Sequence, residues 1–334
     1  MFFNKPEFLN NTMSQNYEIM RTYLIFYFNI ISDILSTQFR NSVHIYKKSG
    51  IFFEPSSSEE INYVSNMSIK ALSFNIDDLA FHRHKYPSKR VTEIIEFLKS
   101  TKADIICLQE VWGELMKQEI SDAFLANNFY VALPSWQKKY YFGENSGLMV
   151  LSKYPIISQT FVPFTNSRGI CRLANKGVQY CHIRVPNTDP KTSFELNIAN
   201  THLQSSLVEF NKILDYQDTA KEQLRTIISE CPYESCILTG DLNITREQID
   251  DFIKNEQNID YFGSNDKNTY PNYDDRLDYF LKIEKLNTLT KTVAERNSVR
   301  TGIDLSDHYP IECEFTIETP ESTPEPTPSD TAQC

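Results

Sequence analysis

The sequence predicts an α+β or α/β body with two β-sheets, and three observations support this prediction. Short apolar runs bounded by polar or turn residues, which are typical of strands, recur between Ser68 and Ile317. Amphipathic stretches that suit helices lie between some of these runs. The segment from Ser152 to Val185 has no convincing helical pattern and indicates hairpins. Mixed strands with interposed helices favour two sheets, although the pattern leaves the topology open.

Both strands and helices are expected along this body. Strands are predicted at residues 69–76, 103–111, 129–133, 146–152, 194–202, 235–244, 276–281 and 309–317. A helix is expected after the first strand, at residues 90–100, because Val91, Ile94 and Leu98 share one face. A longer helix is expected over residues 210–229.

Both ends of the chain differ from this body in composition. Residues 1–67 are predicted to form an N-terminal extension, in which a docked helix is favoured over a membrane-lying segment because its polar face is not rich in Lys or Arg. The Ser- and Glu-rich stretch 54–66 is expected to be a linker. The catalytic domain is predicted at residues 68–317, followed by a disordered Pro-, Thr-, Ser- and Glu-rich tail at residues 318–334.

Composition excludes several classes of protein. The net charge of −11 disfavours a protein that holds nucleic acid by phosphate neutralisation, so no stable nucleic-acid partner is expected. Seven Cys in a long chain argue against a small disulfide scaffold, although Cys171 and Cys181 could pair across a hairpin. Without a secretory signal pattern, a cytoplasmic or membrane-surface location is favoured over classical secretion. No protein partner can be inferred.

Polar side chains gather where the predicted strands end. These acids, amides and imidazoles are Asn75, Gln109, Glu110, His202, Asp241, Asn243, Asp278, Asp307 and His308. If the strands are neighbours, their ends form one rim, where α/β enzymes commonly place their sites. Each residue alone could be a turn residue or a helix cap. So many coincidences predict a single polar site instead.

Seven phrases carry these residues along the chain, namely LSFNI, DIICLQEVW, SGLMVLSKYPI, ANTHLQ, LTGDLNI, RLDY and LSDHYPI. In this order they resemble the motifs of the endonuclease/exonuclease/phosphatase superfamily, which has the DNase I-like fold. The resemblance covers residues 68–317 and implies a four-layer α/β sandwich, with two central mixed β-sheets flanked by helices. Within the superfamily, SGLMVLSKYPI, LANKGVQYCHI and THLQ are most similar to the neutral and bacterial sphingomyelinases.

The superfamily's shared reaction is hydrolysis of a phosphoester by in-line attack of water, which needs a hard cation. Mg²⁺ is expected, with Mn²⁺ as a substitute, because both suit carboxylate, amide and water oxygens. Glu110 is the first candidate ligand, with Asn75 beside it, and Asp307 is a candidate for the same or a second ion. The family often has an aromatic–Gly pair soon after the first Asn, but here Asp77 and Asp78 stand in that place.

The remaining polar residues suit proton transfer and charge stabilisation. His308 can be a general base at neutral pH if a carboxylate holds its other nitrogen. The resemblance implies Asp278 for that carboxylate and Asp241 for orienting the nucleophile. Asn243 and His202 can donate hydrogen bonds to the phosphate or the leaving oxygen.

The resemblance implies the activity of a sphingomyelin phosphodiesterase, which releases phosphocholine from a phospholipid substrate at a membrane surface. Asn175 and Lys176 of the LANKGVQYCHI phrase are assigned to substrate binding. Trp136 lies in an aromatic and Lys-containing stretch, 135–147, that suits a phospholipid interface, and ordinary packing of an aromatic hairpin is the alternative.

Other activities stay open at this point. An inositol-phosphate or phosphoinositide 5-phosphatase is disfavoured because Asp274-Asp275-Arg276-Leu277-Asp278 stands where that family has Trp-Cys-Asp-Arg. A DNase I-like nuclease is disfavoured because no basic stripe is visible. A catalytically silent binding module ranks last, because every expected motif is present.

Overall fold

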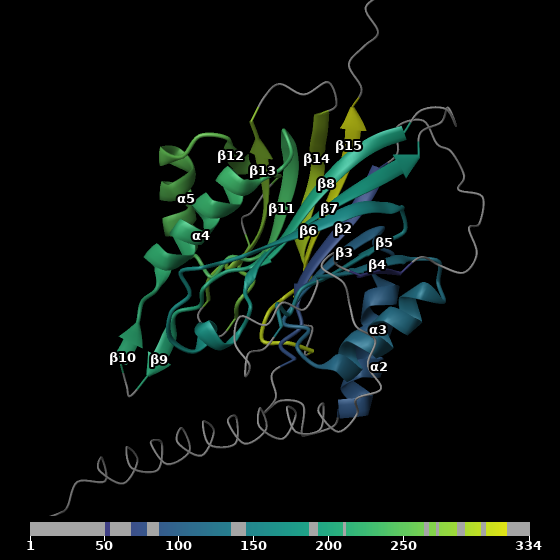
Figure 1. Cartoon of the computed structure of the whole chain (residues 1–334), viewed down its shortest axis with the longest axis horizontal. Helices are drawn as coiled ribbons and strands as arrows, with labels where there is room; N and C mark the ends of the chain where they lie inside the picture. The colour runs from purple at the N-terminus through teal and green to yellow at the C-terminus, as the bar shows by residue number, and fades with distance from the viewer. Residues whose placement is uncertain are drawn as a thin grey trace, which may run out of the picture.

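The computed structural model describes residues 51–53, 68–78, 87–134, 145–186, 193–209, 212–263, 267–271, 274–285, 291–301 and 305–318. Most of the expected extension and tail lies outside these residues, as does Trp136. Over the described part of the chain, two mixed sheets lie face to face with helices on either side (Figure 1). No helix in this part is long and apolar enough to cross a membrane.

The first sheet has seven strands. In spatial order they are β1 (Ile51–Phe53), β4 (Tyr130–Leu133), β5 (Met149–Ser152), β3 (Ile105–Gln109), β2 (Ser68–Asn75), β15 (Ile311–Glu318) and β14 (Lys291–Val299). The central strands β2 and β3 run parallel, so both end at the same edge and Asn75 pairs with Gln109. Strand β1 pairs with β4 at the edge of this sheet. Part of the predicted N-terminal extension, residues 1–67, therefore belongs to the catalytic body.

The second sheet has six strands. In spatial order they are β12 (Ile259–Tyr261), β13 (Asp278–Glu284), β11 (Ser235–Asp241), β8 (Ser193–His202), β7 (Gly177–Pro186) and β6 (Ile156–Pro163). Strands β8 and β11 are parallel and pair His202 with Asp241, while the antiparallel β13 pairs Asp278 with Asp241. The antiparallel β6 and β7 confirm the hairpin pattern expected between Ser152 and Val185, with a short 3₁₀ helix, η1 (Gly169–Leu173), between them.

Four α-helices flank the sheets in the described residues. They are α2 (Pro87–Ser100), α3 (Glu114–Leu125), α4 (Gln217–Glu230) and α5 (Arg246–Asn255). Helix α3 was not predicted, although its buried Met116, Ile120 and Phe124 recur every fourth residue.

The predicted helix over residues 210–229 was wrong at its N-terminal end. A small separate sheet of β9 (Leu207–Glu209) and β10 (Lys212–Leu214) precedes α4. The Oδ1 atom of Asp215 accepts a hydrogen bond from the backbone N–H of Gln217 at 3.0 Å. An Asp side chain that accepts the N–H two residues later is typical of a turn that precedes a helix, and α4 begins at Gln217.

Side-chain alternation along the strands divides the core into three layers. On β2, Ile69 and Ala71 face the second sheet, whereas Leu72 and Phe74 face α2 and α3. Side chains of the second sheet likewise pack between the sheets or against α4 and α5, as Tyr180 does. The order helices, sheet, sheet, helices confirms the predicted four-layer sandwich (Figure 1).

The layer between the sheets changes from apolar to polar toward one end. Gln109 of β3 donates from Nε2 to Asn200 Oδ1 of β8 at 2.8 Å and to Ser73 Oγ of β2 at 3.1 Å. Asn200 donates from Nδ2 to Leu108 O at 3.0 Å. These buried bonds connect the two sheets and fix their relative position directly beneath the strand ends.

Close approach of β8 and β11 predicts a severe effect for Gly240→Ala. Gly240 has φ +138°, and an added Cβ would lie 2.0 Å from the carbonyl oxygen of Thr201. We expect the variant to lose about 2–3 kcal/mol or more of unfolding free energy, measured by urea denaturation. Gly113→Ala is the control, because Gly113 has an ordinary φ of −72°. Equal stability of the two variants would contradict the close pairing of β8 with β11.

Candidate active site

Five strand ends bring the candidate residues to one rim of the sandwich. Asn75 ends β2, His202 ends β8 and Asp241 ends β11, while Asp278 begins the antiparallel β13. Glu110 directly follows β3. All five side chains are buried except that of Glu110, which is partly exposed. The predicted polar rim is therefore one place in the structure.

The Asn75 amide joins the two sheets at this rim. Its Nδ2 lies 3.1 Å from Glu110 Oε1 and 3.0 Å from Asp241 Oδ2, so one amide donates to carboxylates of both sheets. Its Oδ1 accepts the backbone N–H of Asp77 at 3.0 Å. An Asn can satisfy these partners because its amide has two donors and an acceptor, which no carboxylate offers.

Glu110 adopts a backbone conformation that is uncommon for its residue type. Its φ of +57° lies in the left-handed region, as do those of Asp77 and Asn243 nearby. Burial raises the pKa of the Glu110 carboxyl, and the Asp77 carboxylate raises it further, while Lys176 and the Asn75 amide oppose the rise. Backbone strain and a perturbed carboxyl at the same residue are typical of functional sites.

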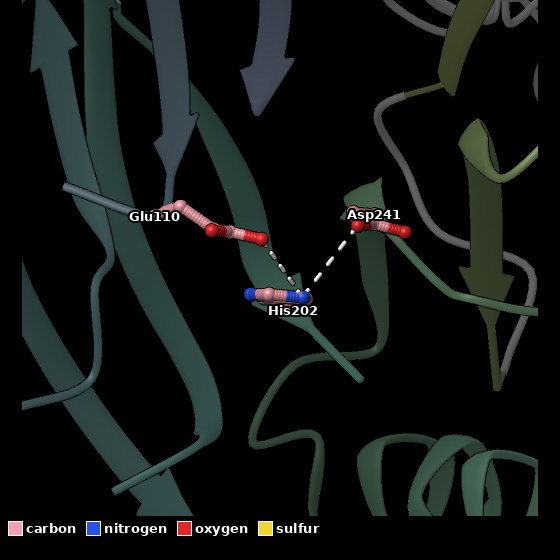
Figure 2. A group of neighbouring side chains, drawn as sticks. All are labelled: Glu110, His202 and Asp241. Carbon is pink, nitrogen blue, oxygen red and sulfur yellow. Dashed lines mark ion pairs between the residues drawn. The ribbon is translucent and has the colours of Figure 1, made fainter. Parts of the chain in front are cut away.

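His202 lies between Glu110 and Asp241, as Figure 2 shows. Its Nε2 is 3.7 Å from Glu110 Oε1 and 3.5 Å from Asp241 Oδ2. The same nitrogen lies 2.9 Å from the Lys176 Nζ, which also donates to Leu203 O at 2.7 Å. Burial, with Lys176 and His308, holds the pKa of His202 well below its usual value, so the ring is neutral. Because the ammonium can only donate, Nε2 accepts and the ring proton lies on Nδ1.

His308 is paired with a carboxylate as the sequence predicts. Its Nδ1 lies 2.8 Å from Asp278 Oδ2, and its Nε2 lies 3.6 Å from Asp241 Oδ2. Burial lowers the pKa of His308, but Asp278 and Asp241 outweigh it and raise the pKa to about 10. Burial raises the pKa of Asp241 to about 7, against the effect of His308. Positive charge on the Glu110 side would lower the pKa of His308 toward the range of a general base.

The other predicted residues also lie at this rim, apart from Trp136, which is outside the described residues. Asn243 Nδ2 donates to Leu203 O at 3.2 Å, the same carbonyl that Lys176 contacts. Asn175 is buried beside Lys176, and its N–H donates to Asn145 O at 3.2 Å.

Asp307 comes to the rim beside His308. Its Oδ1 is 4.0 Å from the Nε2 of His308, and its side chain is about one-third exposed, at 35%. The preceding Ser306 donates from Oγ to Asn75 O at 2.7 Å, which ties this segment to the end of β2. The role of Asp307 as a cation ligand stays a prediction.

Three residues that sequence reasoning did not single out complete the site. Trp112 donates from Nε1 to Glu110 Oε2 at 3.2 Å. The ring of Tyr270 packs on that of His308 with centroids 4.7 Å apart. Arg90 donates to the carbonyls of Ile76 and Leu305, which belong to the segments that carry Asn75 and His308. Only Trp112 had a signal in the sequence, its place two residues after Glu110.

Asp78 occupies part of the stretch after Asn75 where the family often has an aromatic–Gly pair. Its Oδ2 accepts the N–H of Gly113 at 2.7 Å, and its Oδ1 lies 4.0 Å from Arg90. The carboxylate thereby links the end of β2 to the segment after Glu110. Asp78 has a bracing role in this chain.

The donor set fits a hard divalent cation. Two groups of side chains have carboxylate and imidazole atoms within 4.8 Å of one another: Glu110, His202 and Asp241, and Asp241, Asp278 and His308. Two carboxyls with raised pKa values, the buried Asp241 and the partly exposed Glu110, share one amide there, and a divalent cation would relieve that crowding of negative charge. Neither of these groups contains a cysteine. Six cysteines in the described residues, Cys171 and Cys181 among them, are buried and form no disulfide.

Comparison with known proteins agrees with this geometry. A profile of the endonuclease/exonuclease/phosphatase family matches residues 72–308, which include every candidate residue of the rim. The chain belongs to this family. It is therefore a member of a family of hydrolases that act on phosphoesters, and its two-sheet sandwich is the fold expected of that family.

Curated relatives within the family are sphingomyelinases. A sphingomyelinase of Dictyostelium discoideum is 29% identical over 42% of this chain and 37% of its own length. Sphingomyelin phosphodiesterase 3 of Rattus norvegicus is 22% identical over 62% of this chain and 32% of its own length. The chain thus spans about a third of the length of these relatives.

Solved structures share the fold. The beta toxin of Staphylococcus aureus with bound magnesium ions superposes with a TM-score of 0.57 at 19% identity, covering 74% of this chain and 99% of the toxin. TDP2 of D. rerio, complexed with a single-strand DNA product, superposes with a TM-score of 0.56 at 14% identity, covering 74% and 98%. At such identities the likeness concerns the fold alone.

The His308–Asp278 pair predicts a specific titration. Asp278→Asn removes the negative charge beside Nδ1, so we expect the pKa of His308 to fall from about 10 by roughly 1–3 pH units. An NMR titration of the imidazole without added metal measures it. In the native protein, the folded-state pKa exceeds the usual 6.5, so His308 stabilises the fold fully below that pH, and this stabilisation is lost as pH rises toward 10. A His308 pKa unchanged by the substitution would contradict the pairing.

Proposed function

We propose that the protein is a metal-dependent sphingomyelin phosphodiesterase that releases phosphocholine and leaves ceramide. The arrangement of Glu110, Asn75 and Asp241 opposite the His308–Asp278 pair carries the hydrolytic part of this proposal. In this arrangement a partly exposed carboxylate that can bind a cation lies near a buried imidazole that can transfer a proton. The names of the two curated relatives support the substrate, which is a phospholipid at a membrane surface.

Each side chain of the rim has a role in this reaction. Glu110 would hold the cation, with Asp307 as a further ligand. Asn75, predicted as a ligand, presents its Nδ2 to the site and would orient Glu110. When bound, Mg²⁺, or Mn²⁺ in its place, supplies positive charge to the non-bridging oxygens of the phosphate. Lys176 adds a second positive charge, and two of its three N–H donors are used by His202 and Leu203. Its third donor can meet a phosphate oxygen.

Proton transfer falls to His308. Asp278 accepts the hydrogen bond from Nδ1–H, which leaves Nε2 to take the proton of the attacking water. Asp241 Oδ2, 3.6 Å from that nitrogen, can orient the same water. The amide of Asn243 would contribute a hydrogen bond to the developing charge. The Nε2 of His202, predicted as a donor, accepts from Lys176 instead and would hold that ammonium in place.

A nuclease activity is the second candidate, because TDP2, a protein solved with a DNA product, shares the fold. The net charge of −11 weighs against it, since binding to the nucleic-acid backbone relies on basic side chains. A phosphoinositide 5-phosphatase is the third candidate. It is disfavoured because the residues before Asp278 differ from the Trp-Cys-Asp-Arg phrase of that family.

One assay separates these candidates. We expect phosphocholine release from vesicles containing sphingomyelin with Mg²⁺ present and none after exhaustive chelation. Two other substrates are tested under the same conditions: plasmid DNA, and vesicles that contain a phosphoinositide. Neither should be hydrolysed. Cleavage of plasmid DNA with no release of phosphocholine would replace the lipid activity with the nuclease. Activity that survives chelation would contradict the metal dependence.

His308→Ala tests the proton-transfer role. We expect turnover of sphingomyelin to fall by about 10² or more, because a positioned general base contributes roughly 10²–10⁴ in rate. The far-UV circular dichroism should be unchanged, since His308 precedes β15 and lies outside the strand. His182→Ala is the matched control, a histidine paired with Glu195 on the second sheet. Near-normal turnover in His308→Ala would show that another residue is the general base.

A further inference from the structure

The indole of Trp112 is placed to orient the carboxylate of Glu110. Its Nε1–H donates to Oε2 at 3.2 Å, while the Asn75 amide donates to Oε1 at 3.1 Å. Each oxygen of Glu110 therefore has a hydrogen-bond donor from a different segment of the chain. Two such donors fix the plane of the carboxylate as well as its position.

Trp112 is itself held firmly. Its side chain is 7% exposed, and its carbonyl accepts a hydrogen bond from Asn145 Nδ2 at 3.0 Å. Gly147 lies against the ring with φ +68°, and a Cβ there would be 2.8 Å from the Trp112 Cζ3 atom. The carbonyl of Gly147 in turn accepts the N–H of Val111 at 2.9 Å. A glycine is thus required where the turn 145–147 closes on the indole.

The ring also bounds the site on the side of His202. The two ring centroids are 6.3 Å apart at an interplanar angle of 47°. Trp112 is therefore within reach of two of the three residues of the Glu110–His202–Asp241 group. A buried indole N–H needs a hydrogen-bond partner, and here that partner is the carboxylate of the candidate cation ligand.

We propose that Trp112 is a positioning residue that holds Glu110 in the orientation needed to bind a divalent cation. The proposal rests on the metal dependence of the proposed function and adds a residue to it. Groups that hydrogen-bond to metal ligands typically contribute 10–100-fold to metal affinity, because the ligand need not be ordered when the metal binds.

Trp112→Phe tests this proposal, because it keeps an aromatic ring and removes the N–H. We expect the dissociation constant for Mn²⁺, measured on the full chain by electron paramagnetic resonance of the free ion, to rise about 10-fold or more. Tyr180→Phe is the matched control: it also removes one buried aromatic hydrogen bond, from the Tyr180 hydroxyl to Ile227 O at 2.8 Å, on the face of the second sheet that packs against α4. That variant should bind Mn²⁺ as tightly as the native chain does.

A second measurement applies if Trp112→Phe does not fold. The chain has two tryptophans, so Trp136→Phe leaves Trp112 as the sole indole emitter. Saturation with paramagnetic Mn²⁺ should quench that emission, with a midpoint at the dissociation constant found by resonance. Emission that does not respond to Mn²⁺ would overturn the proposal.

The outcomes separate this proposal from the proposed function. If the native chain binds Mn²⁺ and Trp112→Phe binds it equally well, the positioning role is wrong and the function stands. If Tyr180→Phe weakens binding as much as Trp112→Phe does, the effect is general destabilisation and the role is also wrong. If the native chain binds no Mn²⁺, the metal dependence of the proposed function fails and the role of Trp112 fails with it.

Discussion

The hydrogen bonds of the Asn75 amide link the two sheets at the point where the chemistry is placed. Nδ2 contacts Glu110 on its own sheet and Asp241 on the other. This contact requires that the parallel pairs β2–β3 and β8–β11 end at the same edge of the sandwich. It also requires that the last residue of each strand point between the sheets. Strand alternation satisfies the second condition, since Asn75 has the same parity as Ile69 and Ala71 of the inter-sheet core.

Beneath the rim, Gln109 and Asn200 hold the two sheets in the position that this contact needs. Both amides are fully buried, so their hydrogen bonds are made in a medium where an unpaired partner would be costly. A wrong relative placement of the sheets would leave these groups without partners. The polar layer therefore selects one stacking of the sheets, whereas apolar packing alone would tolerate several.

The same burial that fixes the geometry makes the site electrostatically strained. Asp241 and Glu110 are carboxyls with raised pKa values, and His308 has a raised pKa because two carboxylates face it. Lys176 offsets part of the negative charge. Stability is lost where charges are crowded in this way, and a divalent cation would recover some of it. Arg90 and Asp78 keep the segments that carry these groups in place.

The sequence by itself determined the strands that carry the site, the residues at their ends and the family to which they belong. These features depend on local alternation and on the order of short phrases, which are read directly from the chain. Only the tertiary structure decided that α4 begins after Asp215, that Lys176 contacts His202, and that Trp112, Tyr270 and Arg90 belong to the site. Those contacts join segments distant in sequence, or lie in irregular loops, and no periodicity records them. The pKa values of His308 and Asp241 likewise depend on which charges folding brings within a few ångströms of each other.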